Sequence, residues 1–90
     1  MYNILRRDSF VKKAKKFFKK HPQLKEKFKK VILNLENNPF EPSLKTHKLG
    51  GKLNDLYSCS LNYEYRIILS IVIIENNIYL VDIGSHDEVY

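Results

Sequence analysis

Apolar residues recur at helical spacing through the first third of the chain. One set lies within residues 10–18, where Asp8 or Ser9 is expected to cap the helix, and a second set lies within residues 24–35. A His-Pro pair at 21–22 separates the two sets, because proline suits the first turn of a helix and not its interior. The pattern predicts two amphipathic helices that pack as an antiparallel hairpin with their lysines outside.

The second half of the chain reads as strands. "LYSCSLNY" (56–63) alternates between apolar and polar residues, and "YRIILSIVII" (65–74) is a nearly continuous apolar run typical of a central strand. "IYLVDIG" (78–84) predicts the last strand, with an Asn-Asn pair at 76–77 as a two-residue hairpin turn before it. A short first strand is predicted at "YNIL" (2–5). The order of strand, two helices and three strands predicts an α+β fold, an antiparallel meander with the helices on one face.

The composition indicates one small domain that spans residues 1–90. Hydrophobic residues make up 43% of the chain, which suffices for a single core. The lone cysteine, Cys59, excludes an internal disulfide and fits a reducing compartment. Neither a signal-peptide pattern nor an apolar run of membrane length is present, so we expect a cytoplasmic protein without membrane contact.

Charge is distributed unevenly along the chain. Residues 1–52 hold thirteen lysines and two arginines against four acidic residues, whereas residues 53–90 hold one arginine against six acidic residues. This asymmetry, within a net charge of +6, predicts a polyanionic partner for the basic half. The alternative is a merely solvated lysine surface, although "KKAKKFFKKHPQLKEKFKK" has few of the interleaved acids that such surfaces usually carry.

Several classes of site are absent from the sequence. It contains neither a glycine-rich phosphate loop of known spacing nor a CxxC motif, and Gly50-Gly51 alone is a weak signal. The histidines at 21, 47 and 86 lack metal-ligand spacing. We therefore predict no metal site and no cofactor.

One candidate group lies in a polar segment, residues 41–54, where we expect a loop. "KTHKLGGK" places His47 among Lys45, Lys48 and Lys52. A histidine surrounded by lysines suits acid–base chemistry on a phosphate, and the plainer alternative is a surface histidine.

A second candidate group lies where two neighbouring strands meet one edge of the predicted sheet. Arg66 opens the central strand, and His86 and Tyr90 follow the end of its antiparallel neighbour. The spacing therefore permits these three side chains to converge. The plainer alternatives are an Arg66 ion pair with Glu64 or Asp82, a capping role for His86, and a covering role for Tyr90.

These histidine, arginine, lysine and tyrosine side chains are the groups that a metal-free ribonuclease needs. The 2′-hydroxyl of RNA must lose a proton to attack the adjacent phosphate, and the departing 5′-oxygen must gain one. Histidine, with an ordinary pKa of about 6.5, can do either near neutrality. Arginine and lysine stabilise the extra negative charge of the phosphorane, and an aromatic ring can orient a base.

The same stretches carry a family resemblance. "LKTHKLGGKLNDLYSCSLNYEYRIIL" and "IYLVDIGSHDEVY" resemble the RelE/ParE superfamily of bacterial type II toxins, in particular its YafQ-like and RelE/StbE-type members. The resemblance covers nearly the whole chain and implies a small twisted antiparallel sheet of about four strands with two N-terminal helices. It also implies an mRNA interferase that works without metal in the ribosomal A site and is inhibited by a co-expressed antitoxin, expected to be acidic and to wrap the toxin.

The resemblance also assigns roles. His47 matches the loop histidine of the YafQ-like pattern, His86 its C-terminal catalytic histidine and Tyr90 its C-terminal aromatic residue. Arg66 matches the strand arginine that many RelE-like members use at the scissile phosphate. The lysines at 45, 48 and 52 are expected to hold the RNA backbone.

The chain departs from the pattern at residues 61–65, where YafQ-like members carry a further histidine and an aspartate. Glu64 or a tyrosine is a candidate for part of the missing base role, and Tyr65 is a candidate for substrate binding.

Two other functions fit the sequence. A ParE-like inhibitor of DNA gyrase has the same superfamily fold but would not need the paired histidines. An inactive nucleic-acid-binding module would bind through its charge alone, with an affinity that falls with salt.

Overall fold

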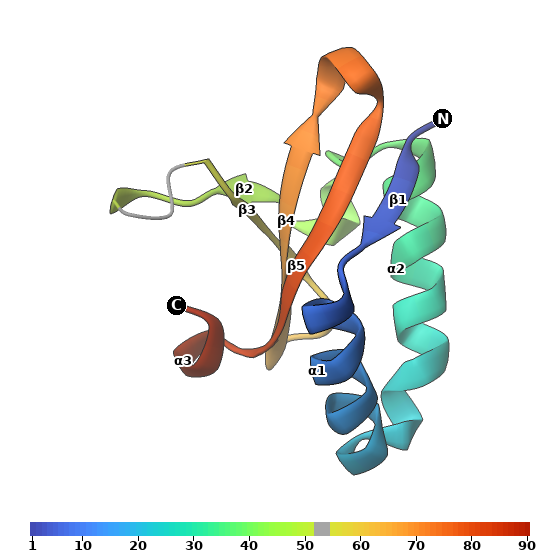
Figure 1. The fold of residues 1–90 in the computed structure, drawn as a ribbon, viewed down its shortest axis with the longest axis vertical. Coiled ribbons are helices and arrows are strands. Elements are labelled where there is room, and N and C mark those ends of the chain that lie inside the picture. Colours follow the sequence, from blue (N-terminus) through green and yellow to red (C-terminus); the bar gives the residue numbers. More distant parts are fainter. Residues whose placement is uncertain (52–54) are drawn as a thin grey trace.

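The computed structural model describes residues 1–51 and 55–90 (Figure 1). Five strands form one sheet in the order β1-β5-β4-β3-β2, and α1 and α2 lie together on one side of it. The elements in chain order are β1 (Asn3–Arg6), α1 (Asp8–Lys20), α2 (Lys25–Asn37), β2 (His47–Lys48), β3 (Tyr57–Ser60), β4 (Tyr65–Val72), β5 (Asn77–Ser85) and α3 (His86–Val89).

The α+β class is confirmed, but the sheet is not wholly antiparallel. β1 pairs with β5 in parallel, whereas the β5-β4, β4-β3 and β3-β2 pairs are antiparallel. The helical hairpin separates β1 from its partner along the chain, so their relative direction is set by tertiary packing rather than by a turn. The expectation of about four strands also missed β2, which is only two residues long and too short to show a period.

The helical hairpin agrees with the prediction. The chain breaks at His21 and passes through a short 3-10 turn, Pro22–Leu24, before α2 begins. The expected cap is wrong, because α1 already begins at Asp8 and no side chain caps it. Asp8 instead lies in the first turn, where its charge favours the helix dipole. No helix in the described part of the chain is long and apolar enough to cross a membrane.

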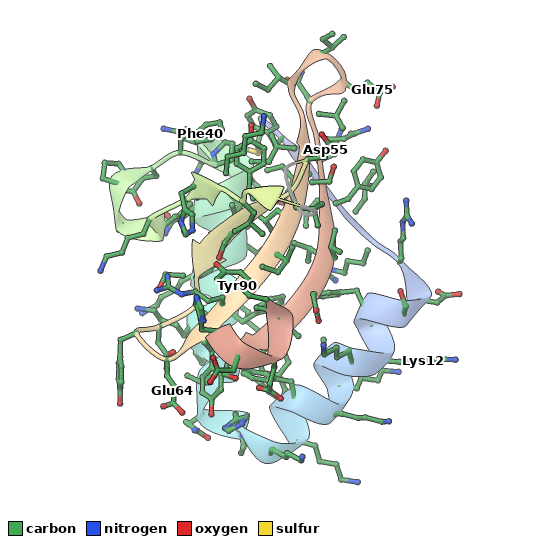
Figure 2. The ribbon with its side chains drawn as sticks, turned by 90° about the vertical axis from the view of Figure 1, so that its left-hand side faces the viewer. Lys12, Phe40, Asp55, Glu64, Glu75 and Tyr90 are labelled. Atoms are coloured by element: carbon green, nitrogen blue, oxygen red, sulfur yellow. The ribbon has the colours of Figure 1, made fainter. Side chains whose placement is uncertain are left out.

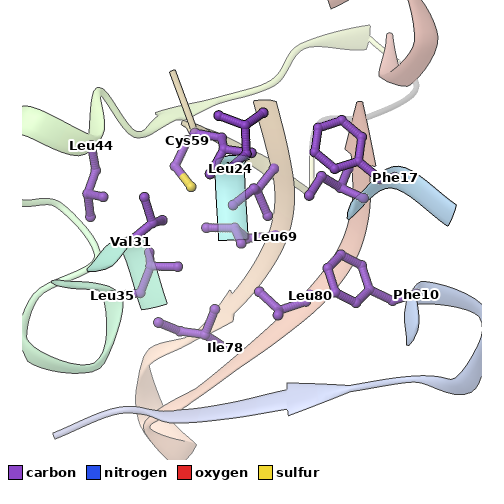
Figure 3. Packing of buried hydrophobic residues seen from close by; sticks show 13 residues of the cluster. Phe10, Phe17, Leu24, Val31, Leu35, Leu44, Cys59, Leu69, Ile78 and Leu80 are labelled. Carbon is purple, nitrogen blue, oxygen red and sulfur yellow. The ribbon is translucent and has the colours of Figure 1, made fainter. Parts of the chain in front are cut away.

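The core lies between this hairpin and one face of the sheet (Figure 3). The helices contribute buried side chains such as Phe17 and Leu35, and the strands contribute Ile67, Leu69, Leu80 and Ile83. Cys59 belongs to the same cluster, and burial raises the pKa of its thiol to about 12, so the thiol is neutral at physiological pH.

The turn between β4 and β5 is longer than predicted. A 3-10 turn, Ile73–Glu75, follows β4, and Asn76 closes the connection with a left-handed φ of 56°. Asparagine tolerates this conformation better than most residues do. Of the predicted Asn-Asn turn, only Asn76 lies in the turn, because Asn77 already begins β5.

Candidate active site

Alternation along β4 separates its side chains into two sets. Ile67 and Leu69 belong to the core, so Arg66 projects to the opposite face of the sheet. Arg66 lies directly across from Ser60 on β3 and from Gly84 on β5. Both neighbours are small, and Arg66 between them is half-buried.

Within the described residues, Arg66 makes no ion pair. The two acidic residues that the sequence suggested as its partners lie elsewhere. Asp82 pairs with Lys13 of α1, and Glu64 lies in the β3–β4 loop. The guanidinium is therefore available to an external anion.

The short helix α3 packs on this same face, beside Arg66. A β-carbon added at Gly84 would lie 3.2 Å from Glu88 Cβ and 3.3 Å from Val89 Cγ1, so α3 sits directly on the glycine. Figure 2 shows α3 in front of the sheet, on the side away from α2. The chain thus turns back over Gly84, which lies across from Arg66 and two residues before His86.

Hydrogen bonding fixes the start of α3. Glu88 Oε1 accepts a hydrogen bond from the backbone N–H of Ser85 at 2.9 Å. Hydrogen bonds from the backbone and side chain of Ser85, followed by the charges of Lys13 and Lys20, lower the pKa of Glu88 below its ordinary value. The carboxylate that holds α3 is accordingly ionised at neutral pH.

His86 and Tyr90 form an aromatic pair at the surface of α3. Their ring centroids are 4.2 Å apart at an interplanar angle of 79°, an edge-to-face arrangement. The His86 side chain is 67% exposed, and its Nδ1 lies 3.7 Å from a carboxylate oxygen of Asp87. An accessible imidazole is oriented by a ring on one side and lies near an acid on the other.

His47 reaches the same face from the far edge of the sheet. It lies across from Ser58 on β3, which in turn lies across from Ile68 on β4. Residues directly opposite each other share a face, so His47 and Arg66 project to the same side, two strands apart. The backbone carbonyl of Lys45 lies 3.2 Å from His47 Nδ1 and restrains the ring.

Two predicted residues lie elsewhere. Tyr65 precedes Arg66 on β4 and projects to the helix side, where its ring packs 5.0 Å from Phe17 and 4.8 Å from His21. Burial raises the pKa of Tyr65, as do a hydrogen bond to Glu64 and the charge of that carboxylate. The structure thus pairs Tyr65 with Glu64, and no ion pair joins Glu64 to Arg66 within the described residues.

The predicted lysines do not behave as one group. Lys48 lies across from Tyr57, which packs against the core, so Lys48 and His47 project to opposite faces. Lys45 lies at a left-handed turn just before β2, with φ 52°. Lys52 lies outside the described residues.

A groove of about 620 Å³ lies away from these residues. It lies between α1 and α2 and has apolar walls, a basic rim and no histidine or acid. Because such walls offer no histidine or carboxylate, the candidate active site is the opposite face, which carries His47, Arg66 and α3. Across the described residues, no group of three His, Cys, Asp or Glu side chains is placed to hold a metal ion.

Comparison with known proteins identifies the family. Residues 2–90 match a protein-family model described as the bacterial toxin of type II toxin-antitoxin system, YafQ. The chain belongs to the YafQ toxin family. No curated protein sequence matches the chain.

Solved structures agree with the YafQ assignment. A metal-bound toxin from Helicobacter pylori is 33% identical, with a TM-score of 0.82 and full coverage of both chains. YafQ from Escherichia coli strain BL21(DE3) is 17% identical over 100% of this chain and 99% of that one, with a TM-score of 0.81. The toxin fold also matches a Staphylococcus aureus YoeB–YefM complex at 22% identity, with a TM-score of 0.74 and coverage of 96% and 98%.

YafQ family membership confirms the superfamily resemblance drawn from the sequence. The sequence did not single out Ser60 and Gly84, the small residues that flank Arg66. Small residues inside otherwise apolar strands are the signal that could have found them.

Proposed function

We propose that this YafQ family member is an endoribonuclease toxin that cleaves mRNA. The observation that carries the proposal is the position of Arg66 across from Gly84, on which Glu88 and Val89 of α3 pack, because α3 also carries the exposed His86–Tyr90 pair. A guanidinium without an ion pair in the described residues, on the face that carries an accessible imidazole, supplies groups that phosphodiester cleavage without a cofactor needs.

The proposed reaction is an internal transesterification. A base takes the proton of the 2′-hydroxyl while the 2′-oxygen bonds to phosphorus and the bond from phosphorus to the 5′-oxygen breaks. An acid gives a proton to the departing 5′-oxygen, which leaves a 2′,3′-cyclic phosphate on one product and a 5′-hydroxyl on the other. No water, metal or oxidant enters this balance.

The acid–base work falls to the two histidines of this face. His86 acts as general acid, or as base with His47 as the opposite partner, since either protonation state of an imidazole is accessible near neutrality. Arg66 stabilises the phosphorane, and Tyr90 orients the substrate. Tyr65 projects to the helix side of the sheet and Glu64 lies in the β3–β4 loop, so neither residue is given a direct part.

The overall charge suits the proposed setting. A net charge of +6 favours long-range association with the RNA of a ribosome, and we place the cut in the A site by family likeness. The charge also suits an acidic antitoxin. YoeB is complexed with its partner YefM in a structure of the same fold, and a YafQ family toxin is expected to have such a partner.

Substitution of His86 tests the proposal. His86→Ala is expected to abolish growth arrest and to reduce message cleavage by about 10²–10⁴-fold, the usual contribution of a positioned acid or base. Because the side chain is exposed, the melting temperature should stay unchanged, which circular dichroism can check.

Lys12→Ala, an exposed change on α1, serves as the control and should keep full toxicity. Undiminished toxicity of His86→Ala would remove His86 from the mechanism. Arrest of DNA replication before protein synthesis would favour the gyrase-inhibitor alternative.

A further inference from the structure

The groove between α1 and α2 is longer than its first hollow. The hollow of about 620 Å³ continues into another of about 380 Å³ farther along α2, because Arg6, Phe28 and Lys29 line both. On α2 the lining extends from Lys25 to Glu36, about 16 Å of helix at 1.5 Å per residue. The groove is therefore long enough to hold about three turns of another helix.

The floor of this groove is apolar. The rings of Phe18 on α1 and Phe28 on α2 meet there, with their centroids 5.0 Å apart. Both side chains are half-buried, and Leu33, farther along α2, is 60% exposed. The other apolar side chains of the lining are Phe10, Val11, Ala14 and Ile32. An apolar strip that is partly exposed and bordered by polar residues is typical of a surface that binds another protein.

The rim of the groove is basic. Two lysines of α1 and two of α2 line it at i, i+4 spacing, and Arg6 adds a fifth cation at the end of β1. The four lysines are Lys15, Lys19, Lys25 and Lys29. Within the described residues, only Lys29 of these five cations has an ion pair, an exposed contact of 3.4 Å with Glu26. The one acid among the described lining residues is Glu36, at the far end.

We infer that this groove binds one helix of a partner protein, an amphipathic helix whose apolar stripe has acidic residues on both flanks. Such a helix lays an apolar residue at every third or fourth position into a hydrophobic groove. Its stripe covers the Phe18–Phe28 floor, and its acidic flanks pair with the lysines of the two walls. Charge complementarity specifies the flanks, because neutral or basic flanks leave the five cations without partners.

Two other occupants fit the groove less well. RNA can pair its phosphates with the lysines, but the Phe18 and Phe28 rings are half-buried against each other, which limits the stacking of a base on them. A second copy of this chain offers no acidic helix within its described residues, since α1 and α2 carry mainly lysines and α3 has only four residues.

Docking at the groove is independent of the proposed nuclease activity. The groove lies on the helix side of the sheet, whereas Arg66 projects to the opposite face. A helix that fills the groove leaves the Arg66 face open, so its binding does not by itself prevent RNA cleavage.

Fluorescence anisotropy with a synthetic peptide tests the inference. The probe is a labelled peptide of about 14 residues, with leucines at i, i+3, i+4 and i+7 along one face and glutamates on both flanks. The control peptide has the same composition in a scrambled order without an apolar stripe. We expect only the amphipathic peptide to bind. In NMR spectra it should shift the ring signals of Phe18 and Phe28 and leave the Arg66 side chain unchanged.

Charge reversal at the rim gives a matched pair of variants. Lys15→Glu/Lys25→Glu changes one lysine on each wall and should weaken peptide binding at least about tenfold at low salt, a difference that shrinks as salt screens the charges. Lys12→Glu/Lys16→Glu makes the same change of net charge on α1 outside the groove and should weaken binding less than about threefold. All four side chains are exposed, so circular dichroism should show unchanged melting for both variants.

Three results of the peptide assay overturn the inference: equal affinity of the two double variants, equal binding of the two peptides, or no binding of the amphipathic peptide at low salt. Two further results identify another occupant and also overturn it. Shifts of the Phe18 and Phe28 rings on addition of single-stranded RNA mark an RNA surface, and the same shifts with rising protein concentration mark a second copy. Each leaves the role of His86 to the cleavage assay of His86→Ala.

Discussion

Two small residues create the space in which Arg66 lies. Ser60 and Gly84 flank it on the neighbouring strands, and larger side chains there would fill the surface that a phosphate needs. A larger side chain would be tolerated less well at Gly84 than at Ser60, because α3 packs directly on Gly84. The glycine therefore controls where His86 is held relative to Arg66.

Gly84→Ala tests this spacing. The new methyl group would lie 3.2–3.3 Å from Glu88 and Val89, so α3 should shift away from the sheet. We expect a loss of stability of about 1–3 kcal/mol, typical of overpacking, and a fall in RNA cleavage of up to about a hundredfold from the displaced imidazole.

Gly50→Ala is the matched control, because a β-carbon there meets nothing within 4 Å. Denaturant unfolding and a cleavage assay measure both effects. Full activity of Gly84→Ala would show that the placement of α3 does not matter.

At the scale of elements, the sequence predicted most of what local periodicity encodes. The break at His21, the second helix and the three later strands follow the pattern, although β3 ends at Ser60 and β4 ends at Val72, both earlier than predicted. Two features depend on tertiary packing and left no local signal: the parallel pairing of β1 and the two-residue β2. His86 was expected beyond the last strand and does follow it, as the first residue of α3.

The α3 element should loosen in acid. The pKa of Glu88 is lowered in the folded protein, so the ionised carboxylate contributes stability above its ordinary pKa, and this contribution is lost as the pH falls through the lowered folded value. Glu88→Gln should therefore speed amide exchange in α3 at pH 7, and the difference from the unaltered protein should vanish in acid.

Hydrogen exchange followed by NMR at several pH values measures this effect. Asp87→Asn, on the same turn, alters an exposed acid that does not bond to the Ser85 backbone and should have a smaller effect. An equal difference between Glu88→Gln and the unaltered protein at all pH values would contradict the role of the carboxylate.

At the scale of the whole molecule, the sheet divides two surfaces. One face packs against the helical hairpin, and the other carries Arg66, His47 and α3. The sequence could place Arg66 and His86 at one edge of the sheet from strand direction alone. Period-two alternation could also have separated Tyr65 from Arg66, whereas the packing of α3 on Gly84 depends on tertiary contacts that no local pattern reveals.

The central claim is that His47, Arg66 and His86 serve one RNA site. NMR titration with a single-stranded RNA whose 2′-hydroxyls are methylated, which prevents cleavage, tests it most directly. We predict that side-chain signals of these three residues shift together with a single dissociation constant. The rings of Phe18 and Phe28, between the helices, should stay unchanged. Shifts confined to α1 and α2, with the two histidines and Arg66 unaffected, would contradict the account.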